Sequence, residues 1–326
     1  MFEGARIIRE RVAKYDIQCD LKDGGVYAAM SAKKVRQLHE HKELWEKWGH
    51  RDLTLVEGRD EVKKIVNSEL YEGVLIDKSG GHFHPLNLAL GEAAALEKLG
   101  GTIYENSAVS KIDRGNPAIV HTAHGQVRAK FVIVACNAYI GELEPKLAAM
   151  SMPCGTQVIA TEPLGDLAKE ILPSDYCVED NNFLLDYFRL SGDGRLIYGG
   201  GVIYGARDPA HVEAIIVPKM LKTFPQLKDV DVEYGWTGNF LLTLSRLPEV
   251  GKLSDNIYYS QGCSGHGVTF THLIGTLLCE AIRGDAERFG AFARLPHYPF
   301  PGGRFFRVPF TAMGALWYNM RDRLGI

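Results

Sequence analysis

The residues best suited to chemistry lie in one stretch of the chain, residues 258–281. It reads Tyr-Tyr-Ser-Gln-Gly-Cys-Ser-Gly-His-Gly-Val-Thr and continues as a mainly apolar run. Three glycines within six residues, Gly262, Gly265 and Gly267, allow backbone N–H groups to approach a bulky ligand closely. A strand is expected before this turn and a helix after it, and a helix N-terminus adds unpaired donors and a partial positive charge. The pattern favours a phosphate or an electron-rich, negatively polarised ring as the ligand, but an ordinary strand–turn–helix explains it equally well.

Other patterns in the chain fit chemical motifs less well. A serine-hydrolase elbow requires Gly-x-Ser-x-Gly, and the second residue after Ser264 is His266. The glycine cluster at residues 199–205 misses the Gly-x-Gly-x-x-Gly spacing by one residue, so we interpret it as a strand end. His82 and His84 would share one face of a strand, but no third ligand is obvious nearby. We therefore expect no metal site.

Composition and charge exclude several classes of function. The 326 residues carry a net charge of −3 with a pI near 6.4, so neither nucleic acid nor an anionic membrane is an expected partner. The cysteines are scattered without a Cys-x-x-Cys pair, which argues against a zinc site or a disulfide framework. The N-terminal residues are charged, and the apolar run at residues 131–136 is too short to cross a membrane. We expect a cytoplasmic protein without a membrane span.

Helical periodicity and apolar runs predict the elements that would position the glycine-rich turn. Helices are expected over residues 2–15, 32–48, 57–66 and 85–99. The inward face of the second would carry Val35, Leu38, Leu44, Trp45 and Trp48. Strands are expected over residues 24–30, 74–77, 102–105 and 131–136, with a hairpin over residues 118–129. The run at 131–136 is continuous and apolar, as in a buried parallel strand, and it indicates half of a doubly wound α/β layer. Ligands bind at the carboxyl ends of such strands, which makes Asn137 a candidate contact.

A second lobe is indicated from residue 152 onward. Short β-rich segments, divided by Gly, Pro and Asp, lie at residues 157–161, 183–190, 195–200 and 230–238. They predict an antiparallel sheet facing the α/β layer, so the fold class is α/β with an α+β second lobe. The α/β lobe would comprise residues 1–20, 80–145 and 245–292. The antiparallel lobe would comprise residues 21–79 and 146–244, and residues 293–326 would pack on the body as a tail.

These segments, in this order, resemble the D-amino-acid-oxidase-type flavin amine oxidases, a family that includes sarcosine and glycine oxidases. The turn Gly262-x-Ser264-Gly265-His266-Gly267 is similar to that family's C-terminal flavin segment. The residues Trp236-Thr237-Gly238, followed by Leu247-Pro248 and Gly251, are similar to the segment before it. Four further segments, residues 80–88, 151–157, 176–180 and 295–303, resemble one amine-oxidising member in particular, over essentially the whole chain.

The resemblance implies FAD as the cofactor and a small-molecule amine as the substrate. A primary amine would be oxidised to an aldehyde with release of ammonia and hydrogen peroxide, with oxygen as the expected acceptor. Hydride would pass from the carbon beside a neutral amine to flavin N5, without a metal or a nucleophile. The implied cofactor contacts are Val109 on the adenine side and Gly262, Ser264, Gly265, His266, Gly267, Val268 and Thr269 around the flavin ring and the ribityl chain.

One departure from the family concerns the dinucleotide-binding segment. Family members carry a glycine-rich N-terminal β–α–β unit, whereas no Gly-x-Gly-x-x-Gly occurs in this sequence. We therefore expect a doubly wound layer that lacks this unit. A truncated remnant without catalytic activity is an alternative to an active oxidase.

A second departure concerns the substrate. The amino-acid oxidases place an Arg shortly after Trp-x-Gly to clamp a carboxylate, and this chain has Asn239-Phe240-Leu241 there. The change favours a substrate whose reacting end is a bare amine, with a sarcosine-, glycine- or D-amino-acid-type oxidase as the alternative. Tyr187, Arg189 and Trp236 are candidate substrate contacts, although ordinary sheet surface explains each of them equally well.

Overall fold

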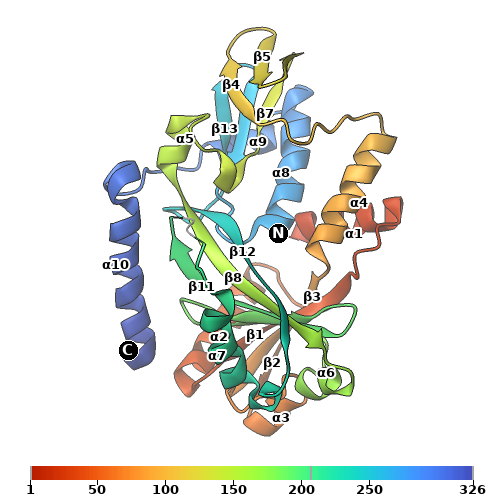
Figure 1. The fold of residues 1–326 in the computed structure, drawn as a ribbon, viewed down its shortest axis with the longest axis vertical. Helices are drawn as coiled ribbons and strands as arrows, with labels where there is room; N and C mark the ends of the chain where they lie inside the picture. Colours follow the sequence, from red (N-terminus) through yellow and green to blue (C-terminus); the bar gives the residue numbers. More distant parts are fainter. Residues whose placement is uncertain (1, 206–207, 325–326) are drawn as a thin grey trace.

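The computed structural model describes residues 2–205 and 208–324, which form a mixed α/β fold in two parts (Figure 1). A large eight-stranded sheet occupies the lower part of the view, and small sheets with packed helices form the upper part. The fold class expected from the sequence is confirmed. The exact lobe boundaries stay a prediction.

The large sheet combines strands from both halves of the chain. Its order is β12-β8-β11-β10-β9-β1-β3-β2, and all neighbours are antiparallel except β1 and β9. The strands are β1 (Lys22–Ala29), β2 (Leu53–Glu57), β3 (Gly73–His82), β8 (Ser151–Pro163), β9 (Cys177–Asp180), β10 (Tyr187–Leu190), β11 (Arg195–Tyr204) and β12 (Val232–Thr243). Each of the four β-rich segments predicted from the sequence contributes a strand, and the glycine cluster lies within the end of β11.

Aromatic side chains form much of the core of this sheet. Phe188 stacks on Tyr198 with ring centroids 5.4 Å apart, and Phe224 meets Phe188 edge-on at 5.1 Å. Buried Tyr198 shares a 2.8 Å hydrogen bond with Thr223, which ends α7 (Val212–Thr223) and so fixes that helix against the sheet. The short helices of this part are α2 (Ala32–Lys47), α3 (Arg59–Lys63) and α6 (Asp166–Ile171), with a 3₁₀ turn at Pro225–Leu227.

The upper part contains the parallel pairing that the sequence predicted. Strand β7 (Val132–Val134) pairs in parallel with β14 (Ile257–Gln261), and β13 (Glu249–Ser254) lies antiparallel beside β14. The predicted hairpin forms a separate sheet of β4 (Val109–Asp113), β5 (Ala118–Thr122) and β6 (Gly125–Ala129). The other elements here are α5 (Pro145–Met150), α8 (Gly267–Ile282), α9 (Glu287–Ala293) and a 3₁₀ turn at Asn137–Tyr139.

Two helices pack beside the start of α8. Helix α1 (Phe2–Tyr15) approaches it closely at Gly4, where a Cβ would lie 2.0 Å from the Thr269 carbonyl oxygen. Helix α4 (Pro85–Lys98) supplies Glu92, which accepts hydrogen bonds from His272 at 3.0 Å and Arg11 at 2.8 Å. The two hydrogen bonds, chiefly the one from His272, lower the pKa of Glu92 to about 2. The first turn of α8 is therefore held in place by both neighbouring helices.

Three details of the sequence prediction are wrong. Residues 102–105 form no strand, and Ile103 and Tyr104 are 41% and 71% exposed, because no described strand lies alongside to share hydrogen bonds. The helix expected over residues 57–66 is confined to α3, because Gly58 turns the chain at φ +92° after β2. Strand β7 is paired only with β14 among the described strands, so Ile133 is exposed rather than buried.

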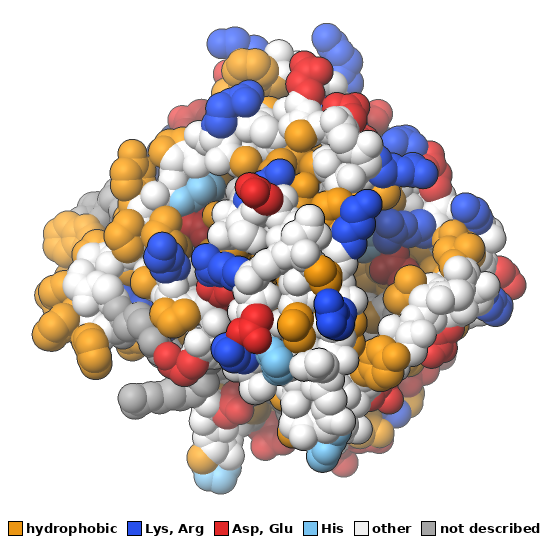
Figure 2. Space-filling model, turned by 90° about the horizontal axis from the view of Figure 1, so that it is seen from above, with side chains coloured by type: hydrophobic (Ala, Val, Ile, Leu, Met, Phe, Trp, Pro, Cys, Tyr) orange, Lys and Arg blue, Asp and Glu red, His pale blue; other side chains and the backbone are white. Residues whose placement is uncertain are grey.

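The C-terminal helix α10 (Gly303–Leu324) runs along one side of the molecule (Figure 1). Phe300 before it is buried, and the Arg307 guanidinium donates to the carbonyl oxygens of Ala148 and Ser151. None of the helices in the described ranges is long and apolar enough to cross a membrane. Acidic and basic side chains are interspersed on the face shown in Figure 2, rather than gathered into a basic surface of the kind that binds nucleic acid.

Candidate functional site

The glycine-rich turn between β14 and α8 has an unusual backbone. Gly262, Ser264 and Gly265 all have positive φ, at +73°, +53° and +96°. Glycine adopts this conformation without steric cost, whereas Ser264 requires support from its surroundings. A Cβ on Gly265 would meet no atom within 4 Å, so the absence of a side chain there leaves the backbone open to a ligand.

Hydrogen bonds to neighbouring segments hold this turn. The Gly262 N–H donates to Asn137 Oδ1 at 3.0 Å, and the Ser264 N–H donates to the Leu241 carbonyl oxygen at 3.0 Å. Ser264 Oγ accepts from the Thr243 N–H at 3.3 Å and donates to the Gly262 carbonyl oxygen at 3.2 Å. The end of β7 and the end of β12 therefore fix the turn from two sides.

A cavity of about 850 Å³ opens beside the turn, within the usual size range of ligand sites. One part of its lining is the turn itself and the first residues of α8, namely Cys263, Gly265, His266, Val268, Thr269 and Phe270. His266 begins α8 without a side-chain cap, and the first N–H groups of a helix have no partner within the helix. This part of the cavity therefore favours a negatively polarised group.

A second part of the lining is aromatic. Phe2 from α1, Tyr27 from β1 and Trp45 and Trp48 from α2 border the cavity, together with His50 in the loop that follows. Trp48 was expected to point inward from the periodicity of α2, but it is 77% exposed and lies at the rim of the cavity. Burial raises the pKa of the Tyr27 hydroxyl, so this side chain is neutral.

The charged groups of the cavity are anchored by ordered contacts. Arg9 binds Asp23 at 2.7 Å and donates to the carbonyl oxygens of Ser79 and Gly80 at 3.2 and 2.9 Å. His82 contacts the Asp175 carbonyl oxygen at 2.9 Å, and burial lowers the pKa of its ring. His84 instead caps α4, where it accepts from the Asn87 N–H, so the two histidines serve different contacts.

The structure separates the predicted cofactor residues into three groups. Gly265, His266, Val268 and Thr269 line the cavity directly. Gly262, Ser264, Gly267 and Asn137 belong to the turn or its hydrogen bonds and are not part of the lining. Val109 pairs with Thr122 in the β4–β5–β6 sheet, apart from the cavity lining. The cofactor role of each residue stays a prediction.

The predicted substrate residues lie elsewhere on the large sheet. The Arg189 guanidinium donates to Asp20 at 3.1 Å, to the Leu190 carbonyl oxygen at 2.8 Å and to the Phe83 carbonyl oxygen. The Tyr187 hydroxyl shares a 2.9 Å hydrogen bond with Thr156, and Trp236 is half-exposed on β12. None of the three lines the cavity, and the contacts of Arg189 are those of a residue that joins segments of the fold.

The residues around the turn fit the ring end of a flavin. The open Cβ position at Gly265 admits a flat group, the uncapped start of α8 supplies donors for a negatively polarised edge, and apolar and aromatic side chains supply the walls. Burial raises the pKa of the Cys263 thiol, which keeps it protonated. Within the described residues, no group of three or more His, Cys, Asp or Glu side chains could hold a metal ion.

Sequence reasoning missed the aromatic part of the cavity and its histidine. Tyr27, Trp45, His50 and Asp77 come from separate elements, and neither their types nor their spacing form a motif. The available signal was compositional, because two of the four tryptophans fall within the short segment 45–48. We read that segment as the inward face of a helix.

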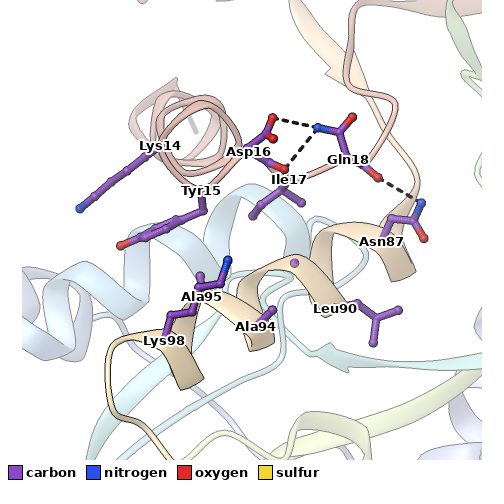
Figure 3. Close-up of a pocket in the computed structure, with 11 residues that line it drawn as sticks. Lys14, Tyr15, Asp16, Ile17, Gln18, Asn87, Leu90, Ala94, Ala95 and Lys98 are labelled. Atoms are coloured by element: carbon purple, nitrogen blue, oxygen red, sulfur yellow. Dashed lines mark hydrogen bonds between the residues drawn. The ribbon is translucent and has the colours of Figure 1, made fainter.

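A second cavity, of about 650 Å³, lies between the end of α1 and α4 (Figure 3). It is bordered by Lys14, Tyr15, Leu90 and Lys98. The backbone carbonyl oxygen of Gln18, just after α1, accepts a hydrogen bond from the Asn87 side chain on α4 at 3.1 Å. It holds none of the residues that the sequence pointed to. The cavity beside the glycine-rich turn is therefore the candidate site.

Comparison with known proteins identifies the family of the chain. The model of the family described as FAD dependent oxidoreductase matches residues 1–281. Gamma-glutamylputrescine oxidoreductase of Escherichia coli (strain K12) is 61% identical over 328 aligned residues, which cover 100% of this chain and 77% of that protein. A probable oxidoreductase, OrdL, of Haemophilus influenzae is 38% identical over 97% of this chain and 74% of its own length.

Solved structures show the same fold at low sequence identity. Glycine oxidase from Geobacillus kaustophilus superposes with a TM-score of 0.74 at 18% identity, covering 85% of this chain and 75% of that one. L-proline dehydrogenase from P. horikoshii gives a TM-score of 0.74 at 20% identity, covering 86% of this chain and 76% of that one. The family resemblance inferred from the glycine-rich turn is confirmed, and this chain belongs to the FAD-dependent oxidoreductase family.

Proposed function

We propose that this chain oxidises the primary amine of gamma-glutamylputrescine, or of a close polyamine conjugate, in putrescine catabolism. The reaction would convert R–CH₂–NH₂, oxygen and water into R–CHO, ammonia and hydrogen peroxide. The observation that carries the proposal is the 61% identity, along the whole chain, to the Escherichia coli enzyme of that name.

The local sequence of β12 supports an amine rather than an amino acid at the reacting end. Asn239, Phe240 and Leu241 occupy the place where the amino-acid oxidases carry a carboxylate-binding Arg. None of these three side chains can form the bidentate ion pair that a carboxylate clamp requires. A conjugate that keeps its amino-acid group away from the reacting carbon has no need of such a clamp.

The residues around the cavity would bind and orient rather than react covalently. The chemistry that bound FAD would supply is the acceptance of a hydride from the carbon beside the amine nitrogen. The first N–H groups of α8, beside Gly265 and His266, would supply donors for negative charge on the ring. Phe2, Trp45 and Trp48 would present apolar surface to the substrate.

Reconstitution with FAD followed by a substrate panel tests the proposal. The purified chain is mixed with FAD, freed of excess cofactor, and assayed for hydrogen peroxide and ammonia with gamma-glutamylputrescine, putrescine, sarcosine and glycine. We expect turnover of gamma-glutamylputrescine above the other compounds. Turnover of sarcosine or glycine in its place would assign an amino-acid-type oxidase, and failure to bind FAD at all would assign a non-catalytic remnant.

A matched pair of variants locates the cofactor. Gly265 and Gly284 both have positive φ, at +96° and +106°, and a Cβ at either would meet no atom within 4 Å. Gly265→Val and Gly284→Val therefore introduce the same kind of backbone strain, but only Gly265 lines the cavity. We expect Gly265→Val alone to lose FAD binding, and equal losses in the two variants would remove the turn from the cofactor site.

A further inference from the structure

His50 and Asp77 form an ordered pair inside the cavity. His50 Nε2 lies 3.0 Å from Asp77 Oδ1, and both side chains are 14% exposed. The same Oδ1 accepts from the Ser79 N–H at 2.9 Å, from Ser79 Oγ at 2.8 Å and from the Gly80 N–H at 3.2 Å. Four contacts on one oxygen fix the carboxylate, and the carboxylate in turn fixes the ring.

Two aromatic rings hold the imidazole from its sides. Trp45 is stacked on His50 with centroids 6.0 Å apart and an interplanar angle of 17°, and Phe2 meets it edge-on at 4.8 Å. Because a carboxylate oxygen only accepts, Nε2 carries the proton of the hydrogen bond, and the neutral ring keeps its lone pair on Nδ1. No hydrogen bond of Nδ1 is present in the described chain, so a positioned proton acceptor remains on a ring that borders the cavity.

We propose that His50, oriented by Asp77, takes the proton from the substrate ammonium before oxidation. The inference rests on the proposed function, because hydride can leave the carbon only when the neighbouring nitrogen has a free electron pair. At pH 7 only about one alkylamine molecule in 2,500 is neutral, given a pKa of about 10.4. In the step itself an N–H bond of the ammonium breaks, its electron pair stays on nitrogen, and the proton binds Nδ1 to give an imidazolium whose charge Asp77 balances.

Other charged and titratable groups border the same cavity. They are Arg9 on α1, Tyr27 on β1, His82 on β3, and Arg246 and His266 beside the glycine-rich turn, while His41 stacks on Trp45 at 5.7 Å. Arg9 is bound to Asp23 and to two carbonyl oxygens, and burial lowers the pKa of His82 and raises that of Tyr27. Among these groups, the ring of His50 is the one held by a largely shielded carboxylate within the cavity, that of Asp77.

The pH profile of the FAD-loaded enzyme separates proton transfer from a structural role. We expect His50→Gln to lower kcat/KM for gamma-glutamylputrescine about 100-fold at pH 7, the lower range for loss of a general base. The deficit should shrink with each added pH unit and become small around pH 10, where about a quarter of the amine is neutral without help. A deficit that stays constant from pH 7 to pH 10 would overturn the proposal.

The chain offers a matched control on α2, the helix that precedes the loop of His50. His39 forms a similar contact, Nε2 to Glu57 Oε1 at 2.8 Å, but its side chain is 48% exposed and lies outside the cavity lining. His39→Gln should reproduce the wild-type rate and pH profile. A loss in His39→Gln equal to that in His50→Gln would show that removing a histidine from this region, rather than a proton acceptor from the cavity, causes the effect.

A binding measurement without FAD keeps this inference distinct from the proposed function. Trp45 and Trp48 border the cavity, so tryptophan fluorescence of the FAD-free chain should change saturably with added gamma-glutamylputrescine. We expect about tenfold weaker binding in His50→Gln, from loss of a hydrogen bond to a charged group, and unchanged binding in His39→Gln. Equal affinity in both variants would exclude contact with His50, whereas selective weakening without turnover would leave the contact standing and refute the oxidase.

Discussion

The contact between α1 and α8 makes a sharp prediction about Gly4, because two helices of the candidate site meet there without room for a side chain. A Cβ at Gly4 would lie 2.0 Å from the Thr269 carbonyl oxygen and 2.7 Å from its carbonyl carbon. Ordinary contact begins at 3.4 Å, so Gly4→Ala must separate the helices by about 1.4 Å. Backbone atoms cannot swing aside as a flexible side chain can, and the first turn of α8 must move with them.

The expected cost follows from two opposing terms. Overpacking of this kind costs roughly 1–3 kcal/mol, and replacing glycine by alanine in a helix returns about 0.5–1 kcal/mol. Gly4→Ala should therefore lower the free energy of unfolding by about 1–2 kcal/mol. Gly275→Ala, in the middle of α8 with nothing within 4 Å of the new Cβ, should raise it by about 0.5–1 kcal/mol.

Urea unfolding of both variants, followed by circular dichroism, tests whether the two substitutions change the free energy of unfolding in opposite directions. FAD affinity, measured by quenching of flavin fluorescence on binding, provides a second readout, because Thr269 lines the cavity. We expect weaker FAD binding in Gly4→Ala and unchanged binding in Gly275→Ala. A Gly4→Ala chain as stable as Gly275→Ala, with the same FAD affinity, would refute the view that this contact positions the start of α8.

Three further predictions concern buried or ionised groups. The hydrogen bond from His272 lowers the pKa of Glu92 from 4.5 to about 2, so the ionised carboxylate stabilises the fold above about pH 4.5 and this stabilisation fades toward pH 2. Glu92→Gln should therefore lower the free energy of unfolding, measured by urea titration, by on the order of 1 kcal/mol at pH 7 after solvent screening, and by less at pH 3. Burial raises the pKa of Glu249, whose Oε2 accepts from Gln261 at 2.6 Å. Its Oε1 makes no hydrogen bond in the described chain and lies 3.5 Å from Nδ1 of His297, whose own pKa is lowered by burial, so the ring is neutral at pH 8. Glu249→Gln should match or exceed wild-type stability at pH 8, with a smaller gain at pH 5, and a clear loss at pH 8 would contradict this reasoning. Cys279 is exposed whereas the other cysteines are partly or fully buried, so brief iodoacetamide treatment should label Cys279 first in peptide maps, and earlier labelling of any other cysteine would contradict the burial pattern.

Local sequence patterns predicted the helices and strands well where their periodicity and turn residues were consistent with the packing of neighbouring elements. The helix at residues 2–15, the helix that was expected over residues 32–48, the hairpin at residues 118–129 and the parallel strand at 132–134 all form. The segment 102–105 has strand-forming residues but stays irregular. Strand propensity acts through pairing, and among the described residues this segment has no strand to pair with.

The turn at residues 262–267 was found from sequence because its chemistry is local. Closely spaced glycines and a following helix place backbone donors together whatever the rest of the chain does. Asn137 also came from a local rule, the carboxyl end of a strand, and it lies 3.0 Å from the Gly262 N–H. The hydrogen bond places Asn137 beside the turn, but Asn137 does not line the cavity, and its contact with a cofactor stays a prediction.

The aromatic end of the cavity depends on arrangement, which spacing does not encode. His50 and Asp77 are 27 residues apart, one in a loop and one on β3, and they meet because Leu53–Glu57 pairs antiparallel with the first half of that strand. The register of β1 against β3 shifts between the pairs Gly25–Asp77 and Asp23–Gly81, and beside this shift the Asp77 carboxylate accepts from the N–H groups of Ser79 and Gly80 as well as contacting the ring. The carboxylate that orients the proposed proton acceptor therefore lies at a sheet irregularity, and a site of this kind becomes visible only when the strands are assembled.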